Sequence, residues 1–143
     1  MNNNNYDLSK QDIINIELAL KLINNRQLRE AEEIYRKLIK KGVNNFVVFS
    51  NLATLSGLKG KHQERIDLLK KSLKINPNVS DTNYNLANAL KTIGNIDDAI
   101  HFYQKAIKLK PNFPTAYNNI GSAFQIKGNI NSAINSYKKA IKL

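Results

Sequence analysis

The sequence repeats with a fixed offset of 34 residues, and this repetition restricts the folds open to the chain. Between Ser80 and Phe113 the spaced apolar, small and aromatic residues recur 34 places later, identical or similar in kind. The matched pairs are Leu86 with Ile120, Ala87 with Gly121, Gly94 with Gly128, Ala99 with Ala133, Tyr103 with Tyr137 and Ala106 with Ala140. A period of this size predicts one supersecondary unit per repeat, stacked on its neighbours in a quasi-one-dimensional array.

The same register continues toward the N-terminus. The equivalent positions hold Leu52, Ala53, Gly60 and Leu69 one unit earlier, and Leu18, Ala19, Arg26, Ala31 and Tyr35 two units earlier. We therefore expect repeats at residues 12–45, 46–79, 80–113 and 114–143, the last incomplete and uncapped, after a disordered tail and cap start at residues 1–11.

Each repeat carries the pattern of two helices. Apolar residues recur at spacings of three and four in both halves, which predicts amphipathic helices, and no alternating strand pattern interrupts them. Glycine, which tolerates a left-handed backbone, should end the first helix of a repeat and, as Gly42, the second helix of the first repeat. Proline should end the second helix of the next two repeats, at Pro77 and Pro111. Ser9, Ser80 and Asn95 are predicted N-caps. The fold class predicted is all-α, a solenoid of four helix-turn-helix repeats.

Composition excludes several kinds of chemistry. The chain has no cysteine and only two histidines, His62 and His101, at non-equivalent places in their repeats, so we expect no metal site. No nucleophile and base recur together, so we expect no catalytic residue and no cofactor. There is no secretory signal and no apolar run long enough to cross a bilayer, so we expect a cytoplasmic protein with no membrane partner.

The chain is basic, with 22 lysines and arginines against 11 acids and a net charge of +11. Most of the basic residues lie near the end of the second helix of a repeat, and acids open the same helices. The helix dipole favours this distribution, so it indicates a solvated surface more than a nucleic-acid interface. A basic face that binds polyanions is the alternative, and it would show steep salt dependence.

These residues resemble the tetratricopeptide repeat family over residues 12–143. In Tyr117 to Leu143 the aromatic opener, the Ile-Gly pair, the Gly-Asn turn, the Ala, the Tyr and the final Ala fall where that family has them. The resemblance implies a right-handed superhelix in which first helices line a concave groove. It also implies a non-catalytic scaffold that binds a peptide or protein segment.

The second repeat departs from this pattern. Arg65 stands where the other repeats have alanine, and Ser72 stands where Ala106 and Ala140 do, so we expect its two helices to pack less tightly. Arg65 either carries its charged end to the surface or reaches into the groove. In the first repeat, Arg26 replaces the glycine of the turn.

An asparagine ladder is the best candidate for binding. Asn51, Asn85 and Asn119 are spaced 34 residues apart on first helices. A primary amide has donors and an acceptor, so it can pair with a peptide bond whatever the guest's sequence. A similar ladder lines the groove in the repeat region of O-linked N-acetylglucosamine transferases, which implies a backbone-clamping role here. The other residues predicted to line this groove are Tyr84, Asn88, Lys91, Asn118 and Ser122, with Ser50, Thr54 and Gln125 beside them.

Two further alternatives follow from the end of the sequence. Ile134, Tyr137, Ile141 and Leu143 would form an uncovered apolar strip on the last helix, which predicts self-association or a longer chain. The chain could then be the recruiting module of a larger enzyme, similar to a glycosyltransferase or a sulfotransferase.

Overall fold

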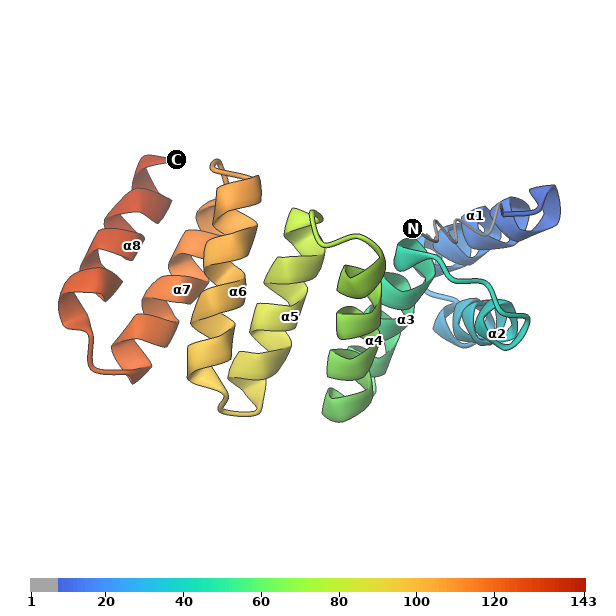
Figure 1. Cartoon of the computed structure of the whole chain (residues 1–143), viewed down its shortest axis with the longest axis horizontal. Coiled ribbons are helices and arrows are strands. Elements are labelled where there is room, and N and C mark those ends of the chain that lie inside the picture. Colours follow the sequence, from blue (N-terminus) through green and yellow to red (C-terminus); the bar gives the residue numbers. More distant parts are fainter. Residues whose placement is uncertain (1–7) are drawn as a thin grey trace, which may run out of the picture.

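The computed structural model describes residues 8–143 of the chain, so the tail predicted at residues 1–7 lies outside the described residues. Eight helices follow one another as four antiparallel pairs, and they stack in a row from the N-terminus to the C-terminus (Figure 1). They are α1 (Lys10–Asn24), α2 (Leu28–Lys40), α3 (Phe46–Leu58), α4 (His62–Ile75), α5 (Ser80–Thr92), α6 (Ile96–Leu109), α7 (Pro114–Ile126) and α8 (Ile130–Lys142). The predicted all-α solenoid of four helix pairs is confirmed.

The turn inside each pair has the same geometry. Gly60, Gly94 and Gly128 have φ of 70°, 82° and 76°, in the left-handed region that favours glycine. The amide of the residue that follows each glycine donates to the carbonyl five residues before it; for Asn95 the acceptor is the Leu90 oxygen, at 3.0 Å. Arg26 adopts this backbone too, at φ 62°. The repeat pattern therefore dictates the turn even where glycine is missing.

Helix starts follow local chemistry, with one correction. Ser9 forms a capping box with Asp12 at the start of α1, and the side chain of Asn95 accepts the Asp98 amide at the start of α6, as predicted. The predicted cap at Ser80 is wrong. Ser80 is the first residue of α5, and its hydroxyl donates instead to the Ala106 carbonyl of α6 at 3.0 Å. A carbonyl near the end of the neighbouring helix offers this hydroxyl a better partner than its own helix does.

Small residues let the two helices of a pair approach closely. Ala19, Ala53 and Ala87 on first helices and Ala31 and Ala99 on second helices are fully buried. Larger side chains, Tyr35, Leu69 and Tyr103, fill the spaces between and are equally inaccessible. The buried residues form one cluster from Ile16 to Ala123, so a single core runs along the array.

The two departures in the second repeat are accommodated. Ser72 is fully buried, and its hydroxyl donates to the Phe46 carbonyl at 2.9 Å, which satisfies the polar group that alanine would lack. Ile66 and Leu69 beside it are buried as well. The expectation that this pair packs less tightly stays a prediction.

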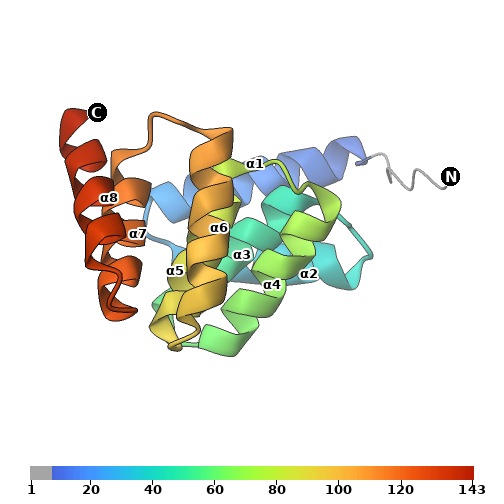
Figure 2. The ribbon, with the colours of Figure 1, turned by 60° about the vertical axis from the view of Figure 1, so that its left-hand side comes forward.

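The first helix pair is oriented differently from the others. In Figure 1, α1 and α2 run crosswise to α3–α8, and Figure 2 shows the same pair from another side. Gly42 ends α2 with φ 95°, and the Val43 amide donates to the Leu38 carbonyl at 3.0 Å. The later links instead contain Pro77 and Pro111, which cannot make such a bond. A different turn thus accompanies the different orientation.

Ion pairs join the first pair to the second. The Arg36 guanidinium bonds to Glu32 at 2.9 Å and to Glu64 of α4 at 2.8 Å, and Lys59 at the end of α3 also contacts Glu32. The Lys59 hydrogen bond, aided by Arg36, holds the pKa of Glu32 below its usual value, against the opposing effect of burial. The Arg36 hydrogen bond lowers the pKa of Glu64 in the same way.

Candidate functional site

The predicted ladder asparagines lie on first helices, Asn51 on α3, Asn85 on α5 and Asn119 on α7. All three side chains are half-buried. They differ in their hydrogen bonds: Asn51 and Asn119 each donate to a tyrosine hydroxyl, and Asn85 does not.

Asn51 is held by a tyrosine of the preceding repeat. Its Nδ2 donates to the hydroxyl of Tyr35, which lies 16 residues earlier in the sequence, at 3.1 Å. The Tyr35 ring is fully buried, and burial raises the pKa of its hydroxyl although the Asn51 bond opposes the rise. The amide of Asn51 therefore satisfies a buried hydroxyl, and this hydrogen bond fixes the orientation of the amide.

Asn119 belongs to a larger polar network. Its Nδ2 donates to the Tyr84 hydroxyl at 2.8 Å and to Oδ1 of Asn88 at 3.0 Å. The same Asn88 oxygen accepts a bond from the Tyr103 hydroxyl. Burial raises the pKa of Tyr103 well above its usual range, so this phenol is a hydrogen-bond donor across the physiological pH range. The structure thus brings together three predicted site residues, Tyr84, Asn88 and Asn119.

Asn85 is the exception. Counting 16 residues back from it gives Leu69, where the repeats on either side have Tyr35 and Tyr103. A leucine offers no hydroxyl, and the Asn85 side chain has no hydrogen-bond partner among residues 8–143. Its amide is therefore free of hydrogen bonds to the described chain.

The other predicted lining residues differ in their exposure and in their hydrogen bonds. Asn118 is exposed, and Ser122 and Lys91 are partly exposed. Gln125 accepts a bond from the Tyr137 hydroxyl at 3.0 Å. Ser50 and Thr54 on α3 turn their hydroxyls back to carbonyls of their own helix. These two therefore offer a guest less than the sequence pattern indicates.

Arg65 lies against a glycine of the neighbouring helix. A Cβ added to Gly57 of α3 would stand 2.9 Å from Cδ of Arg65 and 3.2 Å from its Nε and Nη1. In the described part of the chain, the Nε of Arg65 is the single buried side-chain nitrogen or oxygen that has no hydrogen-bond partner. Burial lowers the pKa of this guanidinium. Two sequence signals point to this arrangement: Gly57 stands where Lys91 and Gln125 do, and Leu69 stands where tyrosine does.

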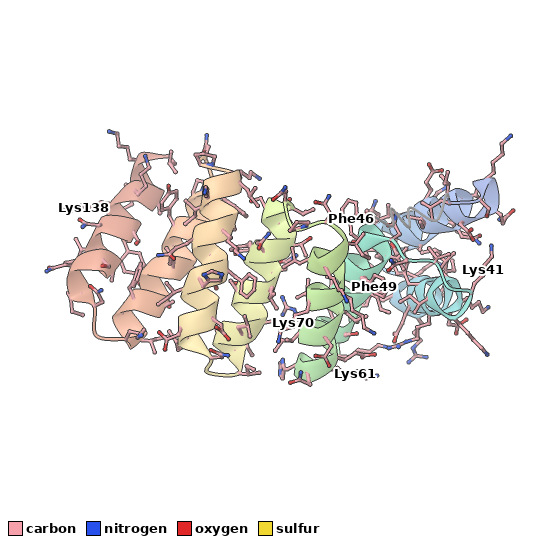
Figure 3. All side chains as sticks on the ribbon, in the orientation of Figure 1. Lys41, Phe46, Phe49, Lys61, Lys70 and Lys138 are labelled. Atoms are coloured by element: carbon pink, nitrogen blue, oxygen red, sulfur yellow. The ribbon has the colours of Figure 1, made fainter. Side chains whose placement is uncertain are left out.

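Three cavities of the described residues lie away from the ladder. One, about 550 Å³, is lined by residues of α2, α3 and α4, among them Phe49, which is labelled in Figure 3. A second, about 270 Å³, lies between α1 and α2, and a third, about 380 Å³, lies beside Pro77 and Asn78. No ladder asparagine lines any of the three. None of these three cavities is therefore the predicted groove.

The apolar face predicted on the last helix is exposed. Ile134, Ile141 and Leu143 expose 44%, 86% and 41% of their surface, and Tyr137 is partly exposed. Self-association through this face stays a prediction, which light scattering at increasing protein concentration would test.

Residues 8–143 show neither a metal site nor a membrane-spanning helix. No group of three or more histidine, aspartate or glutamate side chains could hold a metal ion there. Over the same residues, each helix is too short or too polar to cross a membrane.

Comparison with protein families finds matches over the C-terminal half of the chain and part of the second repeat. A model described as "TPR repeat" matches residues 88–128, and models described as "Tetratricopeptide repeat" match residues 68–101 and 114–143. Together these matches extend from residue 68 to residue 143, which is more than half of the chain. No curated protein matches the sequence significantly.

Solved structures share the fold. The crystal structure of MamA superposes with a TM-score of 0.85 at 26% identity, over 92% of this chain and 77% of that one. The crystal structure of YrrB, described as a TPR protein with an unusual peptide-binding site, gives a TM-score of 0.80 at 20% identity. That match covers 87% of this chain and 64% of YrrB.

Proposed function

The chain belongs to the tetratricopeptide repeat family and is a protein-interaction scaffold, and we propose that it binds an extended peptide or protein segment along the concave face formed by α3, α5 and α7. In this proposal Asn51, Asn85 and Asn119 pair with the guest's backbone, and the protein itself is not catalytic. The single observation that carries the proposal is the open amide of Asn85 between two amides already held in place.

The held amides support the proposal through their rigidity. Asn51 and Asn119 each spend donors on tyrosine hydroxyls, which leaves the carbonyl oxygen of the amide to accept from a guest's N–H. Because these side chains are already oriented, a guest would not have to order them, and the entropy cost of binding would be smaller.

The description of YrrB as a TPR protein with a peptide-binding site is consistent with a peptide guest for this fold. Lys91, Asn118 and Ser122 lie on the same first helices and would supply further polar contacts.

Amide contacts alone are too weak to make a tight complex. Three hydrogen bonds at about 0.5 to 1.5 kcal/mol each contribute about 1.5 to 4.5 kcal/mol, while a micromolar complex needs about 8 kcal/mol. Side chains of the guest must therefore make additional contacts, and the sequence preference of the guest would come from them.

Panning of a phage-displayed library of random 12-residue peptides against the full chain would test the proposal. Selected peptides should bind the protein with micromolar affinity, and Asn85→Ala should weaken each complex about three- to tenfold. This variant is the most informative of the ladder, because no tyrosine loses a partner and stability should be unchanged.

Asn135→Ala, at an exposed position on α8, is the matched control and should leave binding unaltered. Affinities that do not change in Asn85→Ala, or in the triple variant that also replaces Asn51 and Asn119, would remove the ladder from the mechanism.

A further inference from the structure

An arginine is energetically unfavourable at position 65. Ala31, Ala99 and Ala133 occupy the equivalent places in the other repeats, and all three are buried. An arginine there must bury its stem and part of its charged head, which costs free energy unless the charge finds a partner. Its Nε is buried without a hydrogen bond.

No acid of the described chain offsets this cost. The ion pairs of residues 8–143 involve other arginines and lysines, and none includes Arg65. The two terminal nitrogens make no hydrogen bond within the described chain either, but unlike Nε they reach solvent. The guanidinium therefore has a buried Nε and two terminal nitrogens whose donors are accessible to solvent.

Neighbouring substitutions create the space for this side chain. Gly57 lacks the Cβ that would collide with the Arg65 stem at 2.9 Å. Gly57 is equivalent to Lys91 and Gln125, which belong to the proposed binding face. The Arg65 side chain therefore lies against α3 at a position equivalent to those residues. Leu69, one helical turn after Arg65, is the residue that leaves Asn85 without a tyrosine.

The positive charge also acts on the polar network of the next repeat. Arg65 lies close enough to Tyr103 to oppose the rise in the pKa of that phenol, and the Tyr103 hydroxyl contacts Asn88. The Arg65 side chain thus starts on a second helix, while its positive charge acts on a network that includes Asn88 of a first helix.

We propose that Arg65 determines the specificity of this face, by binding the carboxylate of an aspartate or glutamate side chain in the guest segment. A guanidinium presents paired N–H donors that match the two oxygens of a carboxylate. The proposal rests on the proposed function, because it assumes a guest that lies across the ladder.

The position of Arg65 favours an internal acid over a chain terminus. Arg65 belongs to the second repeat, and ladder residues of the second, third and fourth repeats, from Asn51 to Asn119, lie before and after it along the array. A guest that pairs with the whole ladder would continue past Arg65 in both directions, so the carboxylate that meets it would belong to a side chain. The net charge of +11 would attract such an acidic guest at long range.

The test compares matched peptides. Each phage-selected peptide would be synthesised with its acidic residues changed one at a time to the corresponding amide, and with a free or an amidated C-terminus. The unchanged protein should prefer one acid over its amide by about tenfold and should be indifferent to the C-terminus. In Arg65→Ala the acid peptide and its amide should bind with about equal affinity, while binding of the amide peptide persists.

Three controls make the result decisive. Arg65→Ala restores the residue of the sister repeats, and a cooperative thermal transition would verify that it folds. Arg65→Lys keeps the charge but loses the paired donors, so it should keep only part of the preference. Lys70→Ala removes an exposed charge from the same helix and should keep all of it.

The possible failures are distinguishable. If the unchanged protein selects no peptide, the proposed function is overturned, and the assignment of Arg65 with it. If peptides bind but show no acidic preference, or if Arg65→Ala retains that preference, the assignment of Arg65 alone is overturned. A preference for a free C-terminus would show that the carboxylate comes from a chain end, which also contradicts the assignment.

Discussion

Single residues in this protein depart from the repeat pattern in ways that the structure explains. Arg26 keeps the left-handed backbone of the turn although it is not glycine. Arg65 keeps a buried position although it is charged, because Gly57 makes room for it. Leu69 has a different consequence, since it fills its place but leaves Asn85 free.

Arg26→Gly should stabilise the protein. A side chain at φ 62° is strained, and glycine relieves this strain at the cost of a more flexible unfolded chain. The net gain should be about 0.5 to 1 kcal/mol, a rise in Tm of about 2 to 4 °C in a thermal unfolding experiment. Asn25→Gly, at φ −86°, is the control and should lower Tm. A lower Tm in Arg26→Gly would contradict the assigned strain.

Gly57 and Arg65 should be energetically coupled. Alanine suits a helix better than glycine by about 1 kcal/mol, but in the native protein its Cβ would collide with the Arg65 stem. Gly57→Ala should therefore stabilise the Arg65→Ala variant by about 1 kcal/mol and stabilise the native protein much less, or destabilise it. Urea unfolding of the four proteins in a double-mutant cycle measures this difference. Equal effects in both backgrounds would show that the two residues do not interact.

At the scale of the helix, the sequence predicts starts and ends wherever the local chemistry is sufficient. Ser9 and Asn95 cap their helices as expected, because the partner amide lies three residues away. Ser80 does not, because its hydroxyl finds the Ala106 carbonyl of another helix, and no local pattern contains that information. The orientation of the asparagine amides was equally hidden, since it depends on tyrosines 16 residues away or in another repeat.

The junction of α2 with the second helix pair should be sensitive to acid. The pKa of Glu32 is lowered in the folded protein by Lys59 and Arg36, so its ion pairs stabilise the fold above the unfolded carboxyl pKa of about 4.3. This contribution is lost as the pH falls through the lower folded pKa. Glu32→Gln should cost about 1 kcal/mol at pH 7 and should flatten the decline in Tm between about pH 5 and pH 3.

Glu33→Gln is the control for this prediction, since Glu33 is exposed and makes no ion pair among the described residues. Its thermal stability should follow the native pH profile. An unchanged acid profile in Glu32→Gln would mean that other carboxylates, such as Glu64, account for the acid sensitivity.

For the whole molecule, the 34-residue period was enough to predict the order of helices, their pairing and their common core. The crosswise first pair was not predictable from that period. The repeat register is unbroken there, and the difference lies in Gly42 and Val43, which make a hydrogen-bonded turn where the later links have proline. Arg65 was identified in the sequence, but the direction of its side chain depended on Gly57, on the other helix of its pair.

Protection from hydrogen exchange should be greatest in the middle of the array. The joint between α2 and the second pair has ion pairs and an open groove of about 550 Å³, and of the residues of α8 only Ala133 is buried. In a one-dimensional array the ends open at lower free energy than the centre. Exchange measured by mass spectrometry should be slowest in α3–α6 and faster in α1, α2 and α8. Uniform protection would mean that all eight helices unfold as one unit.

The turns at Gly60, Gly94 and Gly128 are made alike, and the links at Pro77 and Pro111 fall at matching places. Residues 80–113 therefore begin and end with junctions that fit another copy of themselves. A tandem duplication of that gene segment would lengthen the protein without requiring any new joint, and each added block would carry its own copy of the ladder amide at Asn85. A change in the number of these blocks would thus change the length of the scaffold that is available to a guest.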